Sequence, residues 1–246
     1  MHCALLLFSV FAIAIAVPIV QDTNVEQTLA TIKYEYAFDI SAPITTTAVA
    51  CLKKSNYTTA YIRGYSDDKG GTFDSNVCDN WHNTNNGGLK TTIYMTPNAR
   101  SVKNGSQQFD EFYYGLLNSC HIKLKTVWIE VPSSSKWPVD SSKSLGFLND
   151  IITTARKRAV TTMGIFTNQA EWDHITRGEK ELTKGLKLWY WKSPAGSQTP
   201  PNFDDFRAFG SWTAPDVKRF ATKVSQCGIS VNSMLAIAVP QSNPHP

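Results

Sequence analysis

Short apolar runs rich in β-branched and aromatic residues recur along the chain, with turn-forming residues between them. Runs of this length and composition are typical of strands buried in a sheet. The pattern predicts strands over Tyr34–Ile40, Ala60–Tyr65, Lys90–Met95, Lys125–Val131, Thr161–Thr167, Leu186–Trp191, Phe206–Gly210 and Gly228–Asn232.

Between several of these runs, longer stretches place apolar residues three and four positions apart, which is the spacing of one helix face. In one stretch Phe109, Phe112 and Leu116 share a face, and Pro215 fits the first turn of another. The spacing predicts helices over Ser106–Asn118, Ser141–Arg158, Asn168–Ile175 and Ala214–Gln226.

Alternating strands and helices with connections of this length form parallel β-α-β units. About eight such units predict the α/β class and a single irregular β/α barrel that is TIM-like in architecture. The barrel domain would span residues 34–240, with the turn-rich residues 193–202 as one surface loop. Residues 17–33 would form a short N-terminal arm, and residues 241–246 a C-terminal tail.

The first residues have the pattern of a secretion signal. Cys3–Val20 is apolar and carries no formal charge, and Ala14 and Ala16 have the spacing that a signal peptidase reads. We expect residues 1–16 to be removed as a signal peptide. The alternative, an uncleaved membrane anchor, is disfavoured because the run is short for a span and lacks a basic flank. No integral membrane span is expected in the mature chain.

Cysteine usage agrees with an oxidising compartment. Removal of the signal leaves Cys51, Cys78, Cys120 and Cys227, an even number without CxxC spacing. Two disulfides are expected, and three connectivities are open at this point. Free thiols are the alternative, whereas the spacing disfavours a zinc site. Asn56 and Asn104 begin N-x-S/T triplets and are candidate glycosylation sites.

Composition narrows the function classes. The chain is 42% hydrophobic and 18% charged, which indicates a packed globular protein. The net charge of +4 mildly favours anionic surfaces such as a bacterial wall, or it only sets solubility. Basic residues are dispersed, so nucleic-acid binding is not expected. The sequence lacks a GxSxG elbow, a HExxH motif and phosphate-binding or dinucleotide glycine loops, and we expect no cofactor and no metal.

Two acids lie where a barrel would do its chemistry. Asp39 ends the first predicted strand and Glu130 ends the fourth. In a β/α barrel the carboxyl ends of the strands meet at one face, so these carboxylates would converge. Alternation places Trp128 and Glu130 on the same face of their strand. A carboxylate pair of this kind can act as acid and base on a glycosidic bond, or bind metal.

A series of motifs in a fixed order resembles a known family. The sequence is similar to the nematode lysozyme-like proteins, which resemble glycoside hydrolase family 25. The motifs cover most of the chain from Tyr34 to Asn232, and they are Tyr36–Ser41, Tyr61–Arg63, Tyr94–Pro97, Val127–Glu130, Gly164–Asn168 with Trp172, Leu188–Trp191 and Asp205–Gly210.

The resemblance implies an irregular β/α barrel that cleaves the β-1,4 bond between N-acetylmuramic acid and N-acetylglucosamine in peptidoglycan. Asp39 matches the family's first-strand Asp. Glu130 falls at the Asp of a family Asp-x-Glu pair, with Pro132 at the Glu, and Asn232 falls at the last-strand Asp. Two of four acids would then be missing. In the other register Glu130 is the family's proton donor, and Trp128 replaces the Asp.

The same comparison suggests residues for a substrate cleft. The aromatic residues near strand ends would form a platform for sugar rings, or they would belong to the core. The candidate substrate-binding residues are Arg63, Tyr65, Tyr94, Trp128, Trp189, Trp191, Asp205 and Asn232. For the disulfides we expect Cys51 with Cys227, which would join the region after the first strand to the last helix, and Cys78 with Cys120.

Two functions therefore compete at the sequence level. The first is a secreted, monomeric lysozyme-like glycosidase that acts on bacterial peptidoglycan in innate defence or digestion. It would work outside the cell, in the gut lumen or in secretory or lysosome-like vesicles. The second is a catalytically impaired protein that binds peptidoglycan or a related glycan on the same barrel. A barrel hydrolase for another glycan, such as chitin, is a third interpretation, but the Asp-rich strand motif of chitinase-type barrels is absent.

Overall fold

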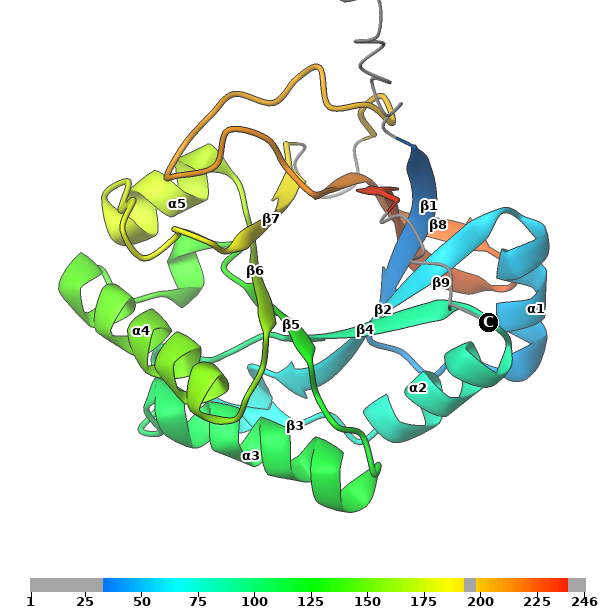
Figure 1. Cartoon of the computed structure of the whole chain (residues 1–246), viewed down its shortest axis with the longest axis horizontal. Coiled ribbons are helices and arrows are strands. Elements are labelled where there is room, and N and C mark those ends of the chain that lie inside the picture. The colour runs from blue at the N-terminus through cyan, green and yellow to red at the C-terminus, as the bar shows by residue number, and fades with distance from the viewer. Residues whose placement is uncertain (1–32, 193–197, 239–246) are drawn as a thin grey trace, which may run out of the picture. The chain divides into compact units, whose positions relative to one another are not determined.

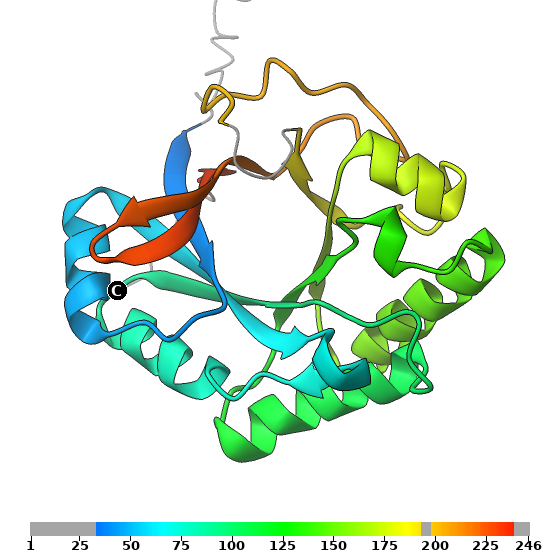
Figure 2. The ribbon, with the colours of Figure 1, turned by 180° about the vertical axis from the view of Figure 1, so that it is seen from behind.

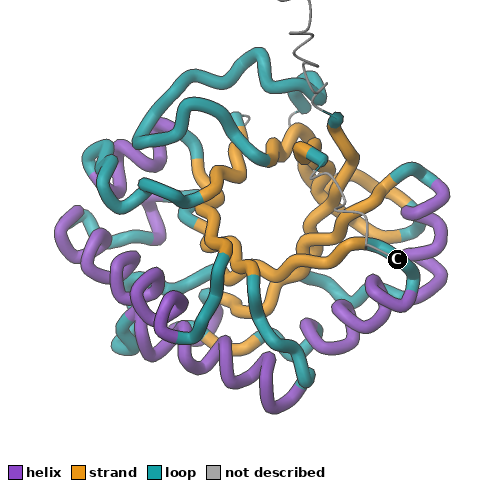
Figure 3. The backbone as a smooth tube through the Cα atoms, in the orientation of Figure 1, coloured by secondary structure: helices purple, strands orange, loops and turns teal. Residues whose placement is uncertain are grey.

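The computed structural model describes residues 33–192 and 198–238. The expected signal peptide, nearly all of the N-terminal arm and the C-terminal tail lie outside these residues, as does the first half of the 193–202 loop. In the described part, strands close into a barrel and helices cover its outer surface (Figures 1 and 3). The predicted fold class is therefore confirmed.

Eight strands of the described chain form the closed barrel. Around it they follow the order β1-β2-β4-β5-β6-β7-β8-β9 and back to β1. All neighbouring pairs from β1 to β8 are parallel, whereas β9 is antiparallel to both β8 and β1. Their bounds are β1 Tyr34–Ile40, β2 Tyr57–Ser66, β4 Lys90–Met95, β5 Thr126–Glu130, β6 Thr162–Thr167, β7 Lys187–Trp191, β8 Val217–Gln226 and β9 Ile229–Ile237. The short β3, Thr72–Phe73, adds to the edge of β2.

Helices lie outside the barrel and begin with polar caps. Asn104 forms a capping box with Gln107 at the start of α3, and Asp140 accepts a hydrogen bond from Ser142 N at the start of α4. The described helices are α1 Thr46–Lys54, α2 Val77–Asn86, α3 Gly105–Ser119, α4 Ser141–Lys157 and α5 Gln169–Thr176, with 3-10 turns at Asp68–Gly70 and Ser134–Lys136.

Two predicted elements were wrong, and two helices were missed. The range Ala214–Gln226 contains strand β8, not a helix. Its apolar residues Val217, Ala221 and Val224 happen to have helical spacing, but the barrel closes only if this segment pairs with β7 and β9. Phe206–Gly210 forms no strand of the barrel: β7 pairs directly with β8, and Phe209 in this segment forms only an isolated bridge to Trp212. The missed helices are α1 and α2.

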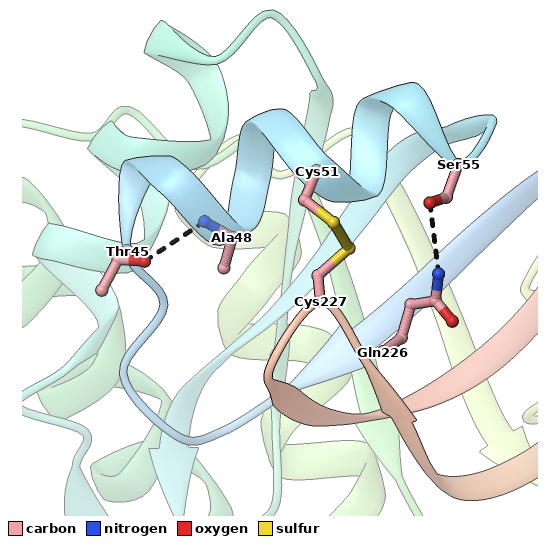
Figure 4. The surroundings of a disulfide bond; sticks show 6 residues. All are labelled: Thr45, Ala48, Cys51, Ser55, Gln226 and Cys227. Atoms are coloured by element: carbon pink, nitrogen blue, oxygen red, sulfur yellow. Dashed lines mark hydrogen bonds between the residues drawn. A yellow bond between two sulfur atoms is a disulfide. The ribbon is translucent and has the colours of Figure 1, made fainter.

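Both expected disulfides are present. Cys51 on α1 joins Cys227 in the turn between β8 and β9 (Figure 4). Cys78 on α2 joins Cys120 at the end of α3. Cys227 lies in a hairpin rather than on a last helix, so the first bridge fastens the β8–β9 hairpin to α1. Figure 2 shows this hairpin and the helix from behind.

The core has two parts. One lies between the sheet and the helices, and the other fills the barrel itself. Within the barrel the rings of Tyr61, Trp128 and Trp189 pack against one another with centroids 4.9–6.1 Å apart. Gly164 on β6 makes room for them, because a Cβ there would lie 2.2 Å from a carbon of the Trp128 ring.

Candidate active site

Inward-facing residues of the strands form layers along the barrel. Successive residues of a strand alternate between its faces, so every second residue points inward. The middle layer is the aromatic cluster around Trp189. The layer above it, at the carboxyl ends of the parallel strands, is polar and contains Asp39, Glu130, Arg219 and Asn232. This face is the one on which barrel enzymes carry their active sites.

Asp39 and Glu130 meet at one guanidinium. Arg219 on β8 donates from Nε to Asp39 Oδ1 over 3.0 Å and from Nη2 to Glu130 Oε1 over 3.4 Å. The side chains of Asp39 and Glu130 are only 2% and 12% exposed. The structure thus brings together the two carboxylates that the sequence singles out, with a cation between them.

Each carboxylate has a second donor. Asn232 donates from Nδ2 to Asp39 Oδ2 over 2.7 Å, and its own Oδ1 accepts from Lys223 N, which fixes the orientation of the amide. Thr96 Oγ1 donates to Glu130 Oε2 over 2.6 Å. Both carboxyl groups are therefore held in place on both oxygens.

Aromatic rings hold the arginine. The Arg219 guanidinium lies 4.1 Å from the centroid of the Phe166 ring and 5.2 Å from that of Trp189. A cation at this distance from a ring is attracted by the negative face of its π-system. The middle aromatic layer therefore supports the polar layer from below.

Burial and the neighbouring opposite charges shift the pKa values of Asp39, Glu130 and Arg219 in opposite directions. Burial raises the pKa of Asp39, while Arg219 and the Asn232 hydrogen bond lower it in part. Burial also raises the pKa of Glu130, against Arg219 and Thr96, and the charge of Asp39 raises it further. Burial lowers the pKa of Arg219, but Asp39 and Glu130 outweigh this and raise it above its usual value. The arginine is therefore charged at any physiological pH.

Most of the expected aromatic platform belongs to the core. Tyr94, Trp128 and Trp189 are at most 4% exposed and fill the barrel. Tyr65 is fully buried in the outer core, and its hydroxyl donates to Glu111 over 3.0 Å. A register shift in β2 between Arg63 and Tyr65 turns Tyr65 away from the barrel interior. These four rings offer almost no free face on which a sugar could stack, which corrects the expectation of a platform.

Three further candidates lie nearer the surface. Trp191 is partly buried, stacks on Phe166 at 6.2 Å, and lines a pocket of about 370 Å³ together with Asp205. Asp205 forms an ion pair of 2.9 Å with the fully buried Lys218. Arg63 forms an ion pair of 2.7 Å with Asp74. Trp191 and Asp205 thus line one pocket together with residues of α5, and neither Asp39 nor Glu130 lines it, whereas Arg63 is held by Asp74.

Sequence reasoning missed Arg219 and Thr96. Arg219 lies in the segment predicted as a helix, Ala214–Gln226, and the alternation of side chains between two faces applies only to strands. In the strand it occupies, Val217 and Arg219 face inward and Lys218 faces outward. Thr96 directly follows β4, so the rule that strand ends face the site could have found it.

Both candidate glycosylation sites lie at the surface. Asn56 is exposed in the turn between α1 and β2, and Asn104 is the exposed N-cap of α3. Pro132 follows the end of β5, and Val131 separates it from Glu130.

In residues 33–192 and 198–238 no group of three or more His, Cys, Asp and Glu residues could hold a metal ion. No helix in these ranges is long and apolar enough to cross a membrane.

Comparison with solved structures identifies the fold. A muramidase from Trichobolus zukalii superposes with a TM-score of 0.65 over 84% of this chain and 95% of that one, at 16% sequence identity. A family GH25 lysozyme from Aspergillus fumigatus gives a TM-score of 0.63 over 85% and 96%, at 15% identity. The chain therefore shares the TIM-like barrel of these proteins.

Sequence comparison identifies the family. Residues 30–220 match the family model described as lysozyme-like protein 1. Lysozyme-like protein 7 of Caenorhabditis elegans is 35% identical and covers 96% of this chain and 90% of its own length. Lysozyme-like protein 1 of the same organism is 39% identical, over 84% and 70%. The chain belongs to the nematode lysozyme-like proteins, a family similar to glycoside hydrolase family 25.

Proposed function

We propose that this chain is a secreted glycoside hydrolase that cleaves β-1,4 bonds of bacterial peptidoglycan, with Asp39 and Glu130 as its catalytic carboxylates. The observation that carries the proposal is their meeting at Arg219, at the carboxyl ends of β1 and β5. Relatives described as GH25 lysozymes, including one from Dictyostelium discoideum at 24% identity, support the reaction class.

The environments of the two carboxylates suggest how they divide the work. Glycoside hydrolysis needs a protonated group for the leaving oxygen and a charged group for the positive transition state. Asp39 faces two strong donors, Arg219 and Asn232, which favour its charged form. Glu130 has the longer contact to Arg219, and the charge of Asp39 raises its pKa. Glu130 is therefore the proton donor and Asp39 the stabilising charge.

The bond chemistry follows from this division. Glu130 gives its proton to the glycosidic oxygen as the bond to the anomeric carbon breaks, and Asp39 stabilises the oxocarbenium-like centre. Water then adds to that carbon, and its proton passes to the ionised Glu130, which restores the acid. Trp191, which contacts Phe166, lines a pocket together with Asp205, and this pocket would hold a neighbouring part of the glycan.

The second candidate function is glycan binding without cleavage. Asn232, at an expected acid position, has a neutral amide that cannot act as an acid or a base, and Arg219 neutralises part of the charge of both carboxylates. A substrate would then be bound at the same face and released unchanged. Pro132, at the other expected acid position, also favours this alternative.

Release of reducing ends from purified peptidoglycan separates the two functions. The wild type should release them, and Asp39→Asn and Glu130→Gln should each reduce the rate by about 100-fold or more while still pelleting with the wall. Glu181→Gln, which changes an exposed acid that forms an ion pair with Lys184, is the matched control and should keep the full rate. A wild type that pellets with the wall but releases nothing from about pH 4 to 8 would establish binding alone.

The proposal extends to where the protein acts. Two disulfides are typical of secreted proteins, and they support export after removal of residues 1–16. We take residues 34–240 as the catalytic domain and a monomer as the working state. Bacterial walls outside the cell or in secretory or lysosome-like vesicles would be the substrate, which fits roles in innate defence or digestion.

A further inference from the structure

The opposite end of the barrel is open and polar. Below the aromatic layer, at the amino ends of the parallel strands, the structure has a pocket of about 620 Å³. Tyr61 and Trp128, which belong to that layer, line it from above. The packed rings of Tyr61, Trp128 and Trp189 separate this pocket from the carboxylates on the other face. It is therefore a second cavity, distinct from the candidate active site.

Hydroxyl groups replace the usual apolar layer at this end. In TIM barrels the inward positions are mostly filled by Val, Ile and Leu. Here the inward position near the start of β2, β4, β5 and β6 is a threonine in each case: Thr59, Thr92, Thr126 and Thr162. Thr92 Oγ1 is buried and has no hydrogen-bond partner among the described residues. A buried hydroxyl without a partner costs free energy unless a ligand or water satisfies it.

Charges around the pocket are balanced. Glu35 forms an ion pair of 3.1 Å with Lys90 and accepts from Thr59 Oγ1 over 3.1 Å. On the other side Lys187 forms an ion pair of 3.2 Å with Asp216. Two carboxylates and two ammonium groups leave no net charge, so a charged ligand would gain little here. Each pair nevertheless offers donors and acceptors to a neutral polar ligand.

We propose that this lower pocket, lined by Thr59, Thr92, Thr126 and Thr162, binds a neutral mono- or disaccharide. Threonine hydroxyls both donate and accept, as sugar hydroxyls do, and the threonine methyl groups can contact the C–H groups of a sugar ring. The volume lies within the range of small-molecule sites. The site is independent of the hydrolysis proposed for the upper face.

Methyl NMR of the full chain with labelled threonines tests the proposal, with N-acetylglucosamine and its β-1,4 disaccharide as probes. The methyl signals of Thr92, Thr126 and Thr162 should shift and saturate. Thr96, which contacts Glu130 in the upper layer, reports the other face. Because the two sites are separate, the lower shifts should persist unchanged in Asp39→Asn, whether or not that variant is active.

A pair of neighbouring variants sharpens the test. Thr162→Val removes one hydroxyl of the pocket with little change of shape and should raise the dissociation constant about 3- to 10-fold. Thr161→Val is the matched control, because Thr161 is exposed, does not line the pocket and should leave affinity unchanged. The proposal is overturned if saturable shifts occur only at Thr96, if no threonine shift saturates, or if both variants bind as the wild type does.

Discussion

Asn232 on β9 donates a hydrogen bond of 2.7 Å to Asp39 on β1, and the two residues face each other in the antiparallel β1–β9 pair. The amide cannot turn, because its oxygen accepts from the backbone N–H of Lys223. Asp39 therefore has a fixed neutral donor on one oxygen and the Arg219 cation on the other. This pairing favours the ionised form of Asp39, against the effect of burial.

Replacing Asn232 with Asp should make stability depend on pH. Asn232→Asp places a second carboxylate 2.7 Å from Asp39, and mutual repulsion raises the pKa of the pair. We expect a loss of about 1–3 kcal/mol at about pH 7 that diminishes as the pH falls and a proton enters the pair. Urea unfolding in acid and at neutral pH measures this. Asn232→Ala removes the bond without adding charge, and because that bond lowers the pKa of Asp39, it should show the same trend with a smaller change between neutral pH and acid.

Glu130→Gln should change the pH profile of stability in a defined direction. Burial raises the folded-state pKa of Glu130 above 4.5, so the folded chain binds its proton more tightly than the unfolded chain. The stability that this provides is present below pH 4.5 and is lost as pH rises through the folded pKa. The variant should therefore gain stability relative to the wild type from about pH 4 to 7, by about 1.4 kcal/mol per unit of pKa shift. A constant difference across this range would contradict the pKa assignment.

Arg219→Met should destabilise the fold and raise both carboxyl pKa values. It leaves Asp39 and Glu130 buried without their shared cation, which costs about 3–5 kcal/mol near neutral pH. The loss should shrink in acid, where the carboxylates take up protons. Chemical denaturation in mild acid and at neutral pH tests this. Arg219→Lys keeps the charge but loses the separate nitrogens that contact Asp39 and Glu130, and it should recover only part of the stability.

Removing the bridge between α1 and the β8–β9 turn should weaken the part of the barrel that carries Arg219 and Asn232. Cys51 and Cys227 are 176 residues apart, and loss of a native disulfide typically costs about 2–5 kcal/mol. The double variant Cys51→Ser/Cys227→Ser should show this loss in urea unfolding. It should also increase amide exchange in β8 and β9 more than in β5 and β6. Equal protection in all four strands would exclude a local role for the bridge.

Two glycines should respond in opposite directions to alanine. Gly164→Ala places a Cβ 2.2 Å from the Trp128 ring in the barrel core, and overpacking there should cost about 1–3 kcal/mol. Gly146 lies in α4, and a Cβ added there would have no heavy atom within 4 Å, so Gly146→Ala should stabilise by about 0.5–1 kcal/mol. Thermal unfolding of both variants measures the contrast. Similar effects at the two positions would disprove the packing explanation.

The position of the site could be predicted from the sequence more completely than the residues that form it. Asp39 and Glu130 end parallel strands, and strand ends converge in any closed barrel, so their meeting could be predicted. Arg219 could not, because the spacing of Val217, Ala221 and Val224 fits a helix, and only the pairing that closes the barrel makes the segment a strand.

The sequence also could not show how deep inside the barrel each inward side chain lies. Alternation shows that Trp128 and Trp189 point inward, but not whether an inward ring fills the core or lines a cleft. That depends on the stagger of the strands, which long-range pairing sets. Tyr65 shows a second limit: the irregularity in β2 beside it reverses its face, and its own residue type gives no sign of this.

The central claim is tested most directly by the initial rate at which wild type and Glu130→Gln release reducing ends from purified peptidoglycan, at equal occupancy of the wall. We predict release by the wild type and a fall of about 100-fold or more in the variant, with wall binding unchanged. A variant that cleaves at the wild-type rate would contradict the assignment of Glu130 as the proton donor.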